Sequence, residues 1–185
     1  MISDESHLKL NQLKIEHGFH SSMRAENQIP DKASFTFEIQ ITKADPSGVT
    51  GTGIGLSSDL HRNNDEPDMF PGMNRTSIGY WCLGDNGTIS KAMGIGPHEI
   101  DTPKFEMERT KAFGENDVIG CHIVRHNIHG IDYAACQFST NGERRGFSHL
   151  LGGHQLYPTV GVISPGTEIK VNLGAEKCQY PLGNT

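Results

Sequence analysis

The stretch GTGIGLSSDL, residues 51 to 60, has the residue types of a phosphate-binding loop, with three glycines at alternate positions followed by serines. Such a loop binds phosphate where it joins a strand to the N-terminus of a helix. Here the glycines lie inside the strand-like run VTGTGIGLS, and the polar residues that follow include two prolines but no helical stripe and no Lys-Ser or Lys-Thr pair. We therefore interpret Gly51, Gly53 and Gly55 as small residues on one strand face, where another layer can approach closely.

Four side chains of types that bind zinc lie close together in the stretch CHIVRHNIHG: Cys121, His122, His126 and His129. Cys121 and His122 are adjacent on a predicted strand, so they point to opposite faces. The spacing of Ile119 and Ile123 directs Cys121 into the core, which leaves the three histidines. No paired C-x-x-C spacing supports a zinc site. We expect no metal, and keep a metal- or small-molecule-binding site in the His-rich segment 122–129 as the alternative function.

No catalytic group stands out in the sequence. A serine hydrolase needs a nucleophile on a strained turn with a histidine and an acid in reach, and no G-x-S-x-G is present. The paired carboxylates Asp65-Glu66 and Glu106/Glu108 lie in stretches that read as polar loops, where charges serve solubility. We predict a protein without catalytic residues and without a cofactor. An enzyme on the same scaffold would need a cluster of histidine, acid and nucleophile that the sequence alone does not reveal.

The composition narrows the class of protein and of partner. The chain has 185 residues, the size of one domain, and a net charge of −6. An acidic chain argues against a nucleic-acid partner, because phosphate binding needs a basic face. No apolar run approaches the roughly 20 residues of a membrane span, and the start MISDESHLKLNQLK is unlike a secretory signal. We expect no membrane partner, a cytoplasmic or nuclear location, and free thiols at the four cysteines.

Alternating apolar residues predict short strands along most of the chain. FTFEIQIT (35–42), DVIGCHIV (117–124) and EIKVNLG (168–174) each place their apolar side chains on one face, and LYPTVGVIS (156–164) reads as a further strand. Asn141-Gly142 between YAACQFST and ERRGFS predicts a hairpin with a type I′ turn. Roughly ten such strands predict an all-β protein, a β-sandwich of two antiparallel sheets.

These stretches also resemble, in order, the strands and turns of the SPRY domain, the B30.2-type sandwich. The stretches that carry the resemblance are FTFEIQI, GTGIGLS, SIGYWCLGDNG, FGENDVIGCHI, FSTNGERRG and LYPTVGVISPGTEIKVNLG. The chain is most similar to the Ran-binding protein M type and to SPRY-containing orphan proteins. Any one of these motifs is weak, but together, in the right order, they are a strong signal.

The resemblance implies a domain layout. Residues 21–175 would form the SPRY domain, after a short N-terminal flanking segment at 1–20 and before a C-terminal tail at 176–185. The flanking segment is open between a short helix and a first strand. The connections 95–114 and 124–134 are longer than is usual in the family. Whether the chain is a stand-alone protein or part of a longer one stays open, as does its oligomeric state.

The resemblance also implies a shallow peptide-reading surface built by loops at one edge of the sandwich. The residues carried over to that surface are Arg75, Thr76, Tyr80, Trp81, Asp85, Asn86, Ile163, Ser164, Pro165 and Gly166. Alternation from Ile78 leaves Tyr80 open between the core and the binding surface. It places Trp81 on the opposite face, where an exposed lone tryptophan is typical of a binding anchor.

We therefore expect a non-catalytic module that binds a short segment of a partner protein. The resemblance implies a role as an adaptor or substrate-recognition part, in some cases within a ubiquitin ligase, although no ligase-recruiting box is visible. We predict that the partner is a protein or peptide, and that the chain binds neither nucleic acid nor a membrane.

Overall fold

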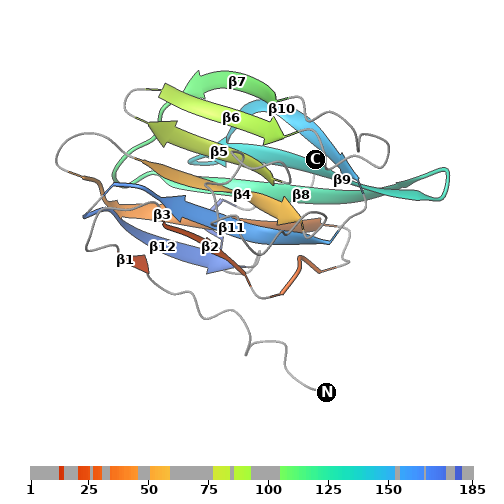
Figure 1. Cartoon of the computed structure of the whole chain (residues 1–185), viewed down its shortest axis with the longest axis horizontal. Helices are drawn as coiled ribbons and strands as arrows, with labels where there is room; N and C mark the ends of the chain where they lie inside the picture. Colours follow the sequence, from red (N-terminus) through yellow and green to blue (C-terminus); the bar gives the residue numbers. More distant parts are fainter. Residues whose placement is uncertain are drawn as a thin grey trace, which may run out of the picture.

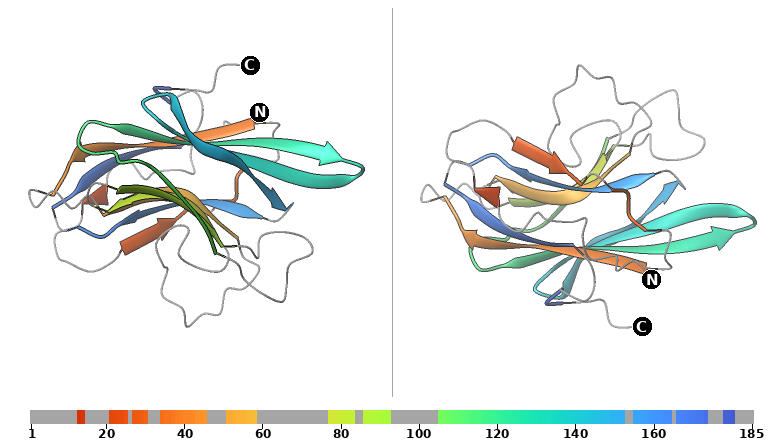
Figure 2. Two further views of the ribbon diagram at one scale, coloured as in Figure 1. Left: turned by 90° about the horizontal axis from the view of Figure 1, so that it is seen from above. Right: turned by 90° about the horizontal axis from the view of Figure 1, so that it is seen from below.

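The structure, a computed structural model, describes residues 13–14, 21–25, 27–30, 34–45, 51–58, 77–83, 86–92, 105–152, 155–164, 166–173 and 178–180. Every regular element in these ranges is a β-strand, and the strands form two antiparallel sheets that face each other (Figures 1 and 2). The predicted all-β sandwich is confirmed. No helix in these ranges is long and apolar enough to cross a membrane.

The first sheet, sheet A, has six strands. Their order across the sheet is β1 (Leu13–Lys14), β12 (Glu168–Leu173), β3 (Ser34–Lys43), β8 (Val118–Ile128), β9 (Ile131–Thr140) and β10 (Glu143–Gly152). Leu13–Lys14 pairs with the start of β12, so the open choice at the N-terminal segment is resolved as a strand at these two residues.

The second sheet, sheet B, also has six strands. Their order is β2 (Ser21–Arg24), β11 (Leu156–Val162), β4 (Thr52–Ser58), β5 (Ser77–Leu83), β6 (Asn86–Ala92) and β7 (Phe105–Lys111). The glycines of β4 lie inside the sheet, with Gly53 opposite Gly161 on one side and Trp81 on the other. Gly53 and Gly55 therefore share one face of a central strand, as predicted, in a setting unlike that of a phosphate loop.

The core lies between the sheets and is built from the alternating residues that the sequence pattern marks. On β3 the side chains of Phe37, Ile39 and Ile41 are fully buried, and on β4 Ile54 and Leu56 meet them from the other layer. Strand alternation sends every second side chain to one face, so the pattern in FTFEIQIT is sufficient to orient β3. The predicted core positions of this strand are confirmed.

Two stretches that the sequence analysis treated as long connections contain paired strands. Residues 105–111 form β7, an edge strand that pairs with β6, so Glu108 lies on a strand and not in a polar loop. Charged residues on exposed edge strands discourage unwanted pairing, and they also remove the apolar alternation by which a strand is recognised. The stretch 124–134 lies mostly in β8 and β9, which stay paired to Ile128 and Ile131 and project beyond the sandwich (Figure 1).

Tight turns with positive φ close both hairpins of sheet A. Asn141 and Gly142 have φ of 51° and 80°, and His129 and Gly130 have φ of 54° and 82°. Positive φ at both central positions is the type I′ arrangement that matches the twist of a hairpin. The predicted Asn-Gly turn is confirmed, and the His-Gly turn is a second example that the sequence analysis did not mark.

Gly142→Val is expected to lower the free energy of unfolding by about 1 kcal/mol or more, because φ is positive there. A Cβ at this position would also lie 3.0 Å from the Tyr180 ring. Gly130→Val is the matched control, since its φ is the same but no atom lies within 4 Å of its added Cβ. Urea denaturation should show the larger loss for Gly142→Val. Equal losses would mean that the Tyr180 contact is unimportant.

Cys121 is expected to resist thiol reagents in the native state. Its side chain and that of Cys136 are fully buried with their sulfur atoms 3.6 Å apart, and burial raises the pKa of Cys121 well above its usual value. A thiolate is the reactive form, so labelling with iodoacetamide at pH 8 should proceed only as the chain unfolds. Rapid native labelling of Cys121 would contradict this orientation of β8.

Candidate functional site

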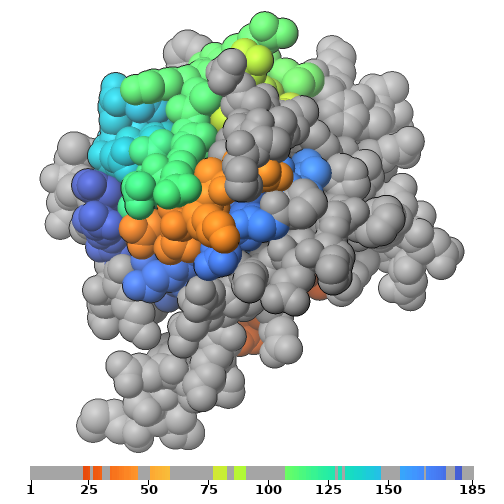
Figure 3. All heavy atoms as spheres, turned by 90° about the vertical axis from the view of Figure 1, so that its left-hand side faces the viewer, coloured from red at the N-terminus to blue at the C-terminus, as the bar shows by residue number. Residues whose placement is uncertain are grey.

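One end of the sandwich gathers several of the residues predicted to bind a partner. β5 ends at Leu83 opposite Asn86, and Asn86 in turn lies opposite Lys111. β11 ends at Val162 opposite Thr52. We call this end the loop end: it comprises Gly51, Asn86, Lys111, the turns 114–117 and 141–142, and residues 163, 164 and 166. Figure 3 looks onto it, with the chain segments of both sheets meeting on one face.

Residues that follow β11 are held in place by Gly51. Ile163 donates its N–H to the Gly51 carbonyl at 2.6 Å, and Gly51 donates its N–H to Ser164 Oγ at 3.1 Å. A Cβ at Gly51 would lie 2.7 Å from Ile163 Cβ, so only glycine fits without a shift. Ser164 is buried by this arrangement, whereas Ile163 and Gly166 are partly exposed. Residues 163 and 164 are therefore tied to Gly51, and the buried Ser164 side chain serves this contact without offering a surface.

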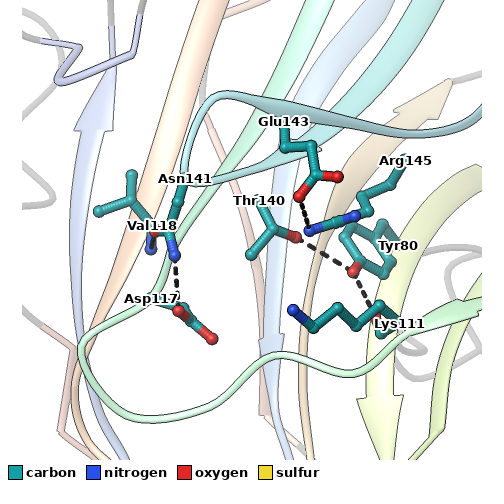
Figure 4. Close-up of polar contacts among 8 residues, drawn as sticks. All are labelled: Tyr80, Lys111, Asp117, Val118, Thr140, Asn141, Glu143 and Arg145. Atoms are coloured by element: carbon teal, nitrogen blue, oxygen red, sulfur yellow. Dashed lines mark hydrogen bonds and ion pairs between the residues drawn. The ribbon is translucent and has the colours of Figure 1, made fainter.

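Tyr80, which the sequence left open between the core and the binding surface, lies in the core. Its side chain is 0% exposed, and its ring meets Phe113 edge to face at 4.9 Å. The hydroxyl donates to the Lys111 carbonyl at 2.7 Å and lies 3.2 Å from Thr140 Oγ1 (Figure 4). Burial raises the pKa of this hydroxyl. Tyr80 therefore ties sheet B to sheet A beneath the loop end, which corrects its predicted contact with a partner.

Trp81 lies on the opposite face of β5 from Tyr80, as predicted. The indole is half-buried and donates its Nε1–H to Ser90 Oγ at 2.8 Å. Its neighbours across the sheet are Gly53 and Thr88. A direct role for Trp81 in binding a partner stays a prediction.

Four of the predicted residues lie outside those that the structure describes: Arg75, Thr76, Asp85 and Pro165. The described parts still limit the predicted surface. β5 begins at Ser77 and ends at Leu83, so its two ends are roughly 20 Å apart. Asn86, Ile163 and Gly166 share the Leu83 end, and they can contribute to one surface there.

Charged groups at the loop end were missed by the sequence analysis. Arg145 pairs with Glu143 at 2.6 Å, and Asp117 accepts hydrogen bonds from Asn141 Nδ2 at 2.7 Å and from the Gly114 N–H at 2.8 Å. Figure 4 shows Glu143, Arg145, Asp117 and Asn141 around Lys111 and the buried Tyr80. They come from both sheets, from positions far apart in the sequence, so no local pattern could have gathered them. The signal in the sequence for this charged group was the polar turn GEND, residues 114–117.

The three histidines of the alternative metal site do not come together. His122 is 1% exposed, between Thr36 Oγ1 at 3.3 Å from Nδ1 and Ser139 Oγ at 2.7 Å from Nε2. His126 and His129 are exposed. Within the ranges described by the structure, no three His, Cys, Asp or Glu side chains are placed to share a metal ion. The imidazole of His122 is instead a structural group of sheet A.

Acid should destabilise the fold through His122. Burial, and next the charge of Arg144, lower the pKa of His122 to about 4. The unfolded chain, with a histidine pKa near 6.5, then binds more protons between pH 6.5 and 4, and the free energy of unfolding falls over that window by on the order of 2 kcal/mol. Urea titrations of wild type and His122→Gln should show that the variant lacks this part of the pH dependence. His126→Gln, on the same strand but exposed, should retain it; a wild-type slope in His122→Gln would overturn the assignment.

Comparison with known proteins finds relatives that are similar in sequence over most of the chain. No family model matches the chain. It is 30% identical over 166 residues to a Ran-binding proteins 9/10 homolog of Drosophila melanogaster, covering 89% of this chain and 15% of that protein. It is 29% identical over 175 residues to Ran-binding protein 9 of Mus musculus, covering 90% of this chain and 23% of that protein. The chain thus spans less than a quarter of the length of these two relatives.

Solved structures give the same fold. The crystal structure of a human SPRY domain matches with a TM-score of 0.64 and 21% identity, over 89% of this chain and 92% of that one. The SPRY domain of human HERC1 matches with a TM-score of 0.55 and 17% identity, over 84% and 83% of the two chains. The two-sheet topology, the order of the motifs and these likenesses together identify the chain as a SPRY domain protein.

Proposed function

We propose that the chain is a protein-interaction module that binds a short, extended segment of a partner protein at the loop end. The relatives support the coarser part, since SPRY domains are interaction modules. The observation that carries the site is the pair of residues after β11, Ile163 and Ser164, which two hydrogen bonds hold to Gly51 at the same end of sheet B as the exposed side chains of Asn86 and Lys111. A surface ordered before binding loses little entropy when a partner docks.

The chemistry of this surface favours a peptide. The Asn86 amide can both donate and accept hydrogen bonds, and Lys111 offers a cation to a carboxylate or a carbonyl. Ile163 adds a partly exposed apolar contact, and Gly166, with φ of 80°, leaves its backbone accessible. Groups of this kind read an extended chain through its backbone and a few side chains.

An adaptor role follows from the same proposal. The matched region is less than a quarter of the two Ran-binding relatives reported above, so in those proteins the SPRY domain works beside other parts of a longer chain. We propose that this module likewise brings a bound partner to a larger assembly, of which a ubiquitin ligase is one candidate. The likeness in sequence and fold supports the module, and the assembly is to be identified by its partners.

A peptide selected against the wild-type chain from a random display library should lose at least tenfold in affinity for Asn86→Ala/Lys111→Ala, which corresponds to about 1.4 kcal/mol. Both side chains are exposed, so the variant should melt like the wild type. Fluorescence anisotropy with the labelled peptide measures the change. His126→Ala/Asp132→Ala, two exposed positions on the projecting hairpin, is the control and should bind unchanged. Equal affinity for both variants would place binding away from the loop end.

A further inference from the structure

The outer face of sheet A is polar but buried at its centre. Residues that face away from the core there include Thr36, Glu38, His122, Gln137 and Ser139, and none is more than 8% exposed. In an antiparallel sheet with one solvated face, such polar residues normally lie in water. Gln137 donates to the Arg145 carbonyl of the neighbouring strand β10, and chain outside the sheet covers part of the rest of this face.

The described part of that cover is Cys178–Tyr180. The N–H groups of Gln179 and Tyr180 donate to the two carboxylate oxygens of Glu38 at 2.6 and 2.8 Å. Glu38 is 0% exposed, so these are charge-assisted hydrogen bonds away from water. The Tyr180 ring packs on Gly142, where an added Cβ would lie 3.0 Å from the ring. Residues 178–180, in dark blue, lie beside the β9–β10 turn in Figure 3.

The surface beneath this segment is held by bonds within the sheet. Gly120 lies opposite both Glu38 and Ser139. A Cβ there would lie 2.7 Å from His122 Nε2 and 2.6 Å from Ser139 Oγ, so the glycine makes room for the bond between these two groups. The ring nitrogens of His122 are thus paired with the hydroxyls of Thr36 and Ser139. Both oxygens of Glu38, by contrast, accept hydrogen bonds from the covering segment. The Glu38 carboxylate is therefore the group of this face that binds the covering segment.

Glu38 binds mostly main-chain groups of the covering segment. The two hydrogen bonds come from consecutive main-chain N–H groups, and the Gln179 side chain is exposed. Two side chains of the segment also contribute: the Tyr180 ring packs on Gly142, and the Cys178 thiol lies 3.7 Å from the Thr36 carbonyl. A segment with the same bend, and with two consecutive non-proline residues of which the second is aromatic, presents the same groups, because proline lacks the N–H.

We propose that the outer face of sheet A is a second peptide-binding site, occupied here by the chain's own residues 178–180. Its ligand is a segment bent as residues 179–180 are here, which offers two consecutive amide N–H groups to Glu38 and an aromatic ring to Gly142. The site is separate from the loop-end surface proposed above and does not depend on it. A segment of a partner with this chemistry binds by displacing the chain's own segment, which competes at an effective concentration on the order of millimolar.

The test uses the full chain with its own segment weakened. Gln179→Pro removes one of the two N–H donors and leaves Glu38 intact. The probe is a fluorescent synthetic peptide of residues 175–185, AEKCQYPLGNT, kept reduced and followed by anisotropy. It should bind Gln179→Pro at least tenfold more tightly than it binds the wild type. Adding Glu38→Gln should remove that gain, whereas adding Glu115→Gln should not. Glu115 also accepts a backbone N–H, that of Ala44, but is exposed and does not touch the segment.

Peptide variants keep the test decisive if Glu38→Gln fails to fold. A probe with proline at position 179, or with alanine at position 180, should bind Gln179→Pro at least tenfold more weakly than the parent probe. Equal binding of all three probes, or binding that is no tighter to Gln179→Pro than to the wild type, would overturn the proposal. So would the absence of binding to Gln179→Pro, since residues 178–180 would then be a fixed part of the fold and not the occupant of a site.

Discussion

The burial of one face of each sheet against the other is the constraint on which the rest of the structure depends. Because side chains alternate along a strand, burying Phe37, Ile39 and Ile41 forces the intervening residues of β3 to the outer face. Tyr80 brings a polar group into this core, and its hydroxyl is satisfied across the interface by Thr140 and the Lys111 carbonyl. An unsatisfied hydroxyl there would cost about 1–3 kcal/mol. The bond therefore favours one relative placement of the sheets.

That placement decides what the loop end can present. β5, β7 and β11 all end there, and β6 begins there, so Asn86, Lys111 and Ile163 reach one surface from different parts of the chain. Gly51 fixes the loop after β11 because the space above it admits no side chain. The position of residues 163 and 164 thus depends on Gly51, the first residue of the glycine-rich stretch GTGIGLS. A motif that resembles a phosphate loop serves packing.

Glu38 is a buried charged group on the outer face of sheet A, where the packing of the core does not require it. Its neighbours on β3, Phe37 and Ile39, hold the strand in the sandwich, and the carboxylate is left facing outward under Cys178–Tyr180. A buried carboxylate must be hydrogen-bonded, and here two main-chain N–H groups supply the bonds. The segments before residue 21 and after residue 175, assigned by sequence to flanks of the domain, both contribute contacts to sheet A through Leu13–Lys14 and Cys178–Tyr180.

The sequence alone determined the fold class, the strands with apolar alternation, the Asn-Gly hairpin and the inward orientation of Cys121, because these depend on local periodicity and turn chemistry. It did not reveal β7, whose charges erase the alternation, or the long β8–β9 hairpin. The burial of Tyr80 and His122, the charged group around Lys111 and the capture of residues 178–180 by Glu38 were decided by tertiary structure. Each joins residues distant in the chain, and whether a polar side chain meets water or a partner depends on which other segment packs over it.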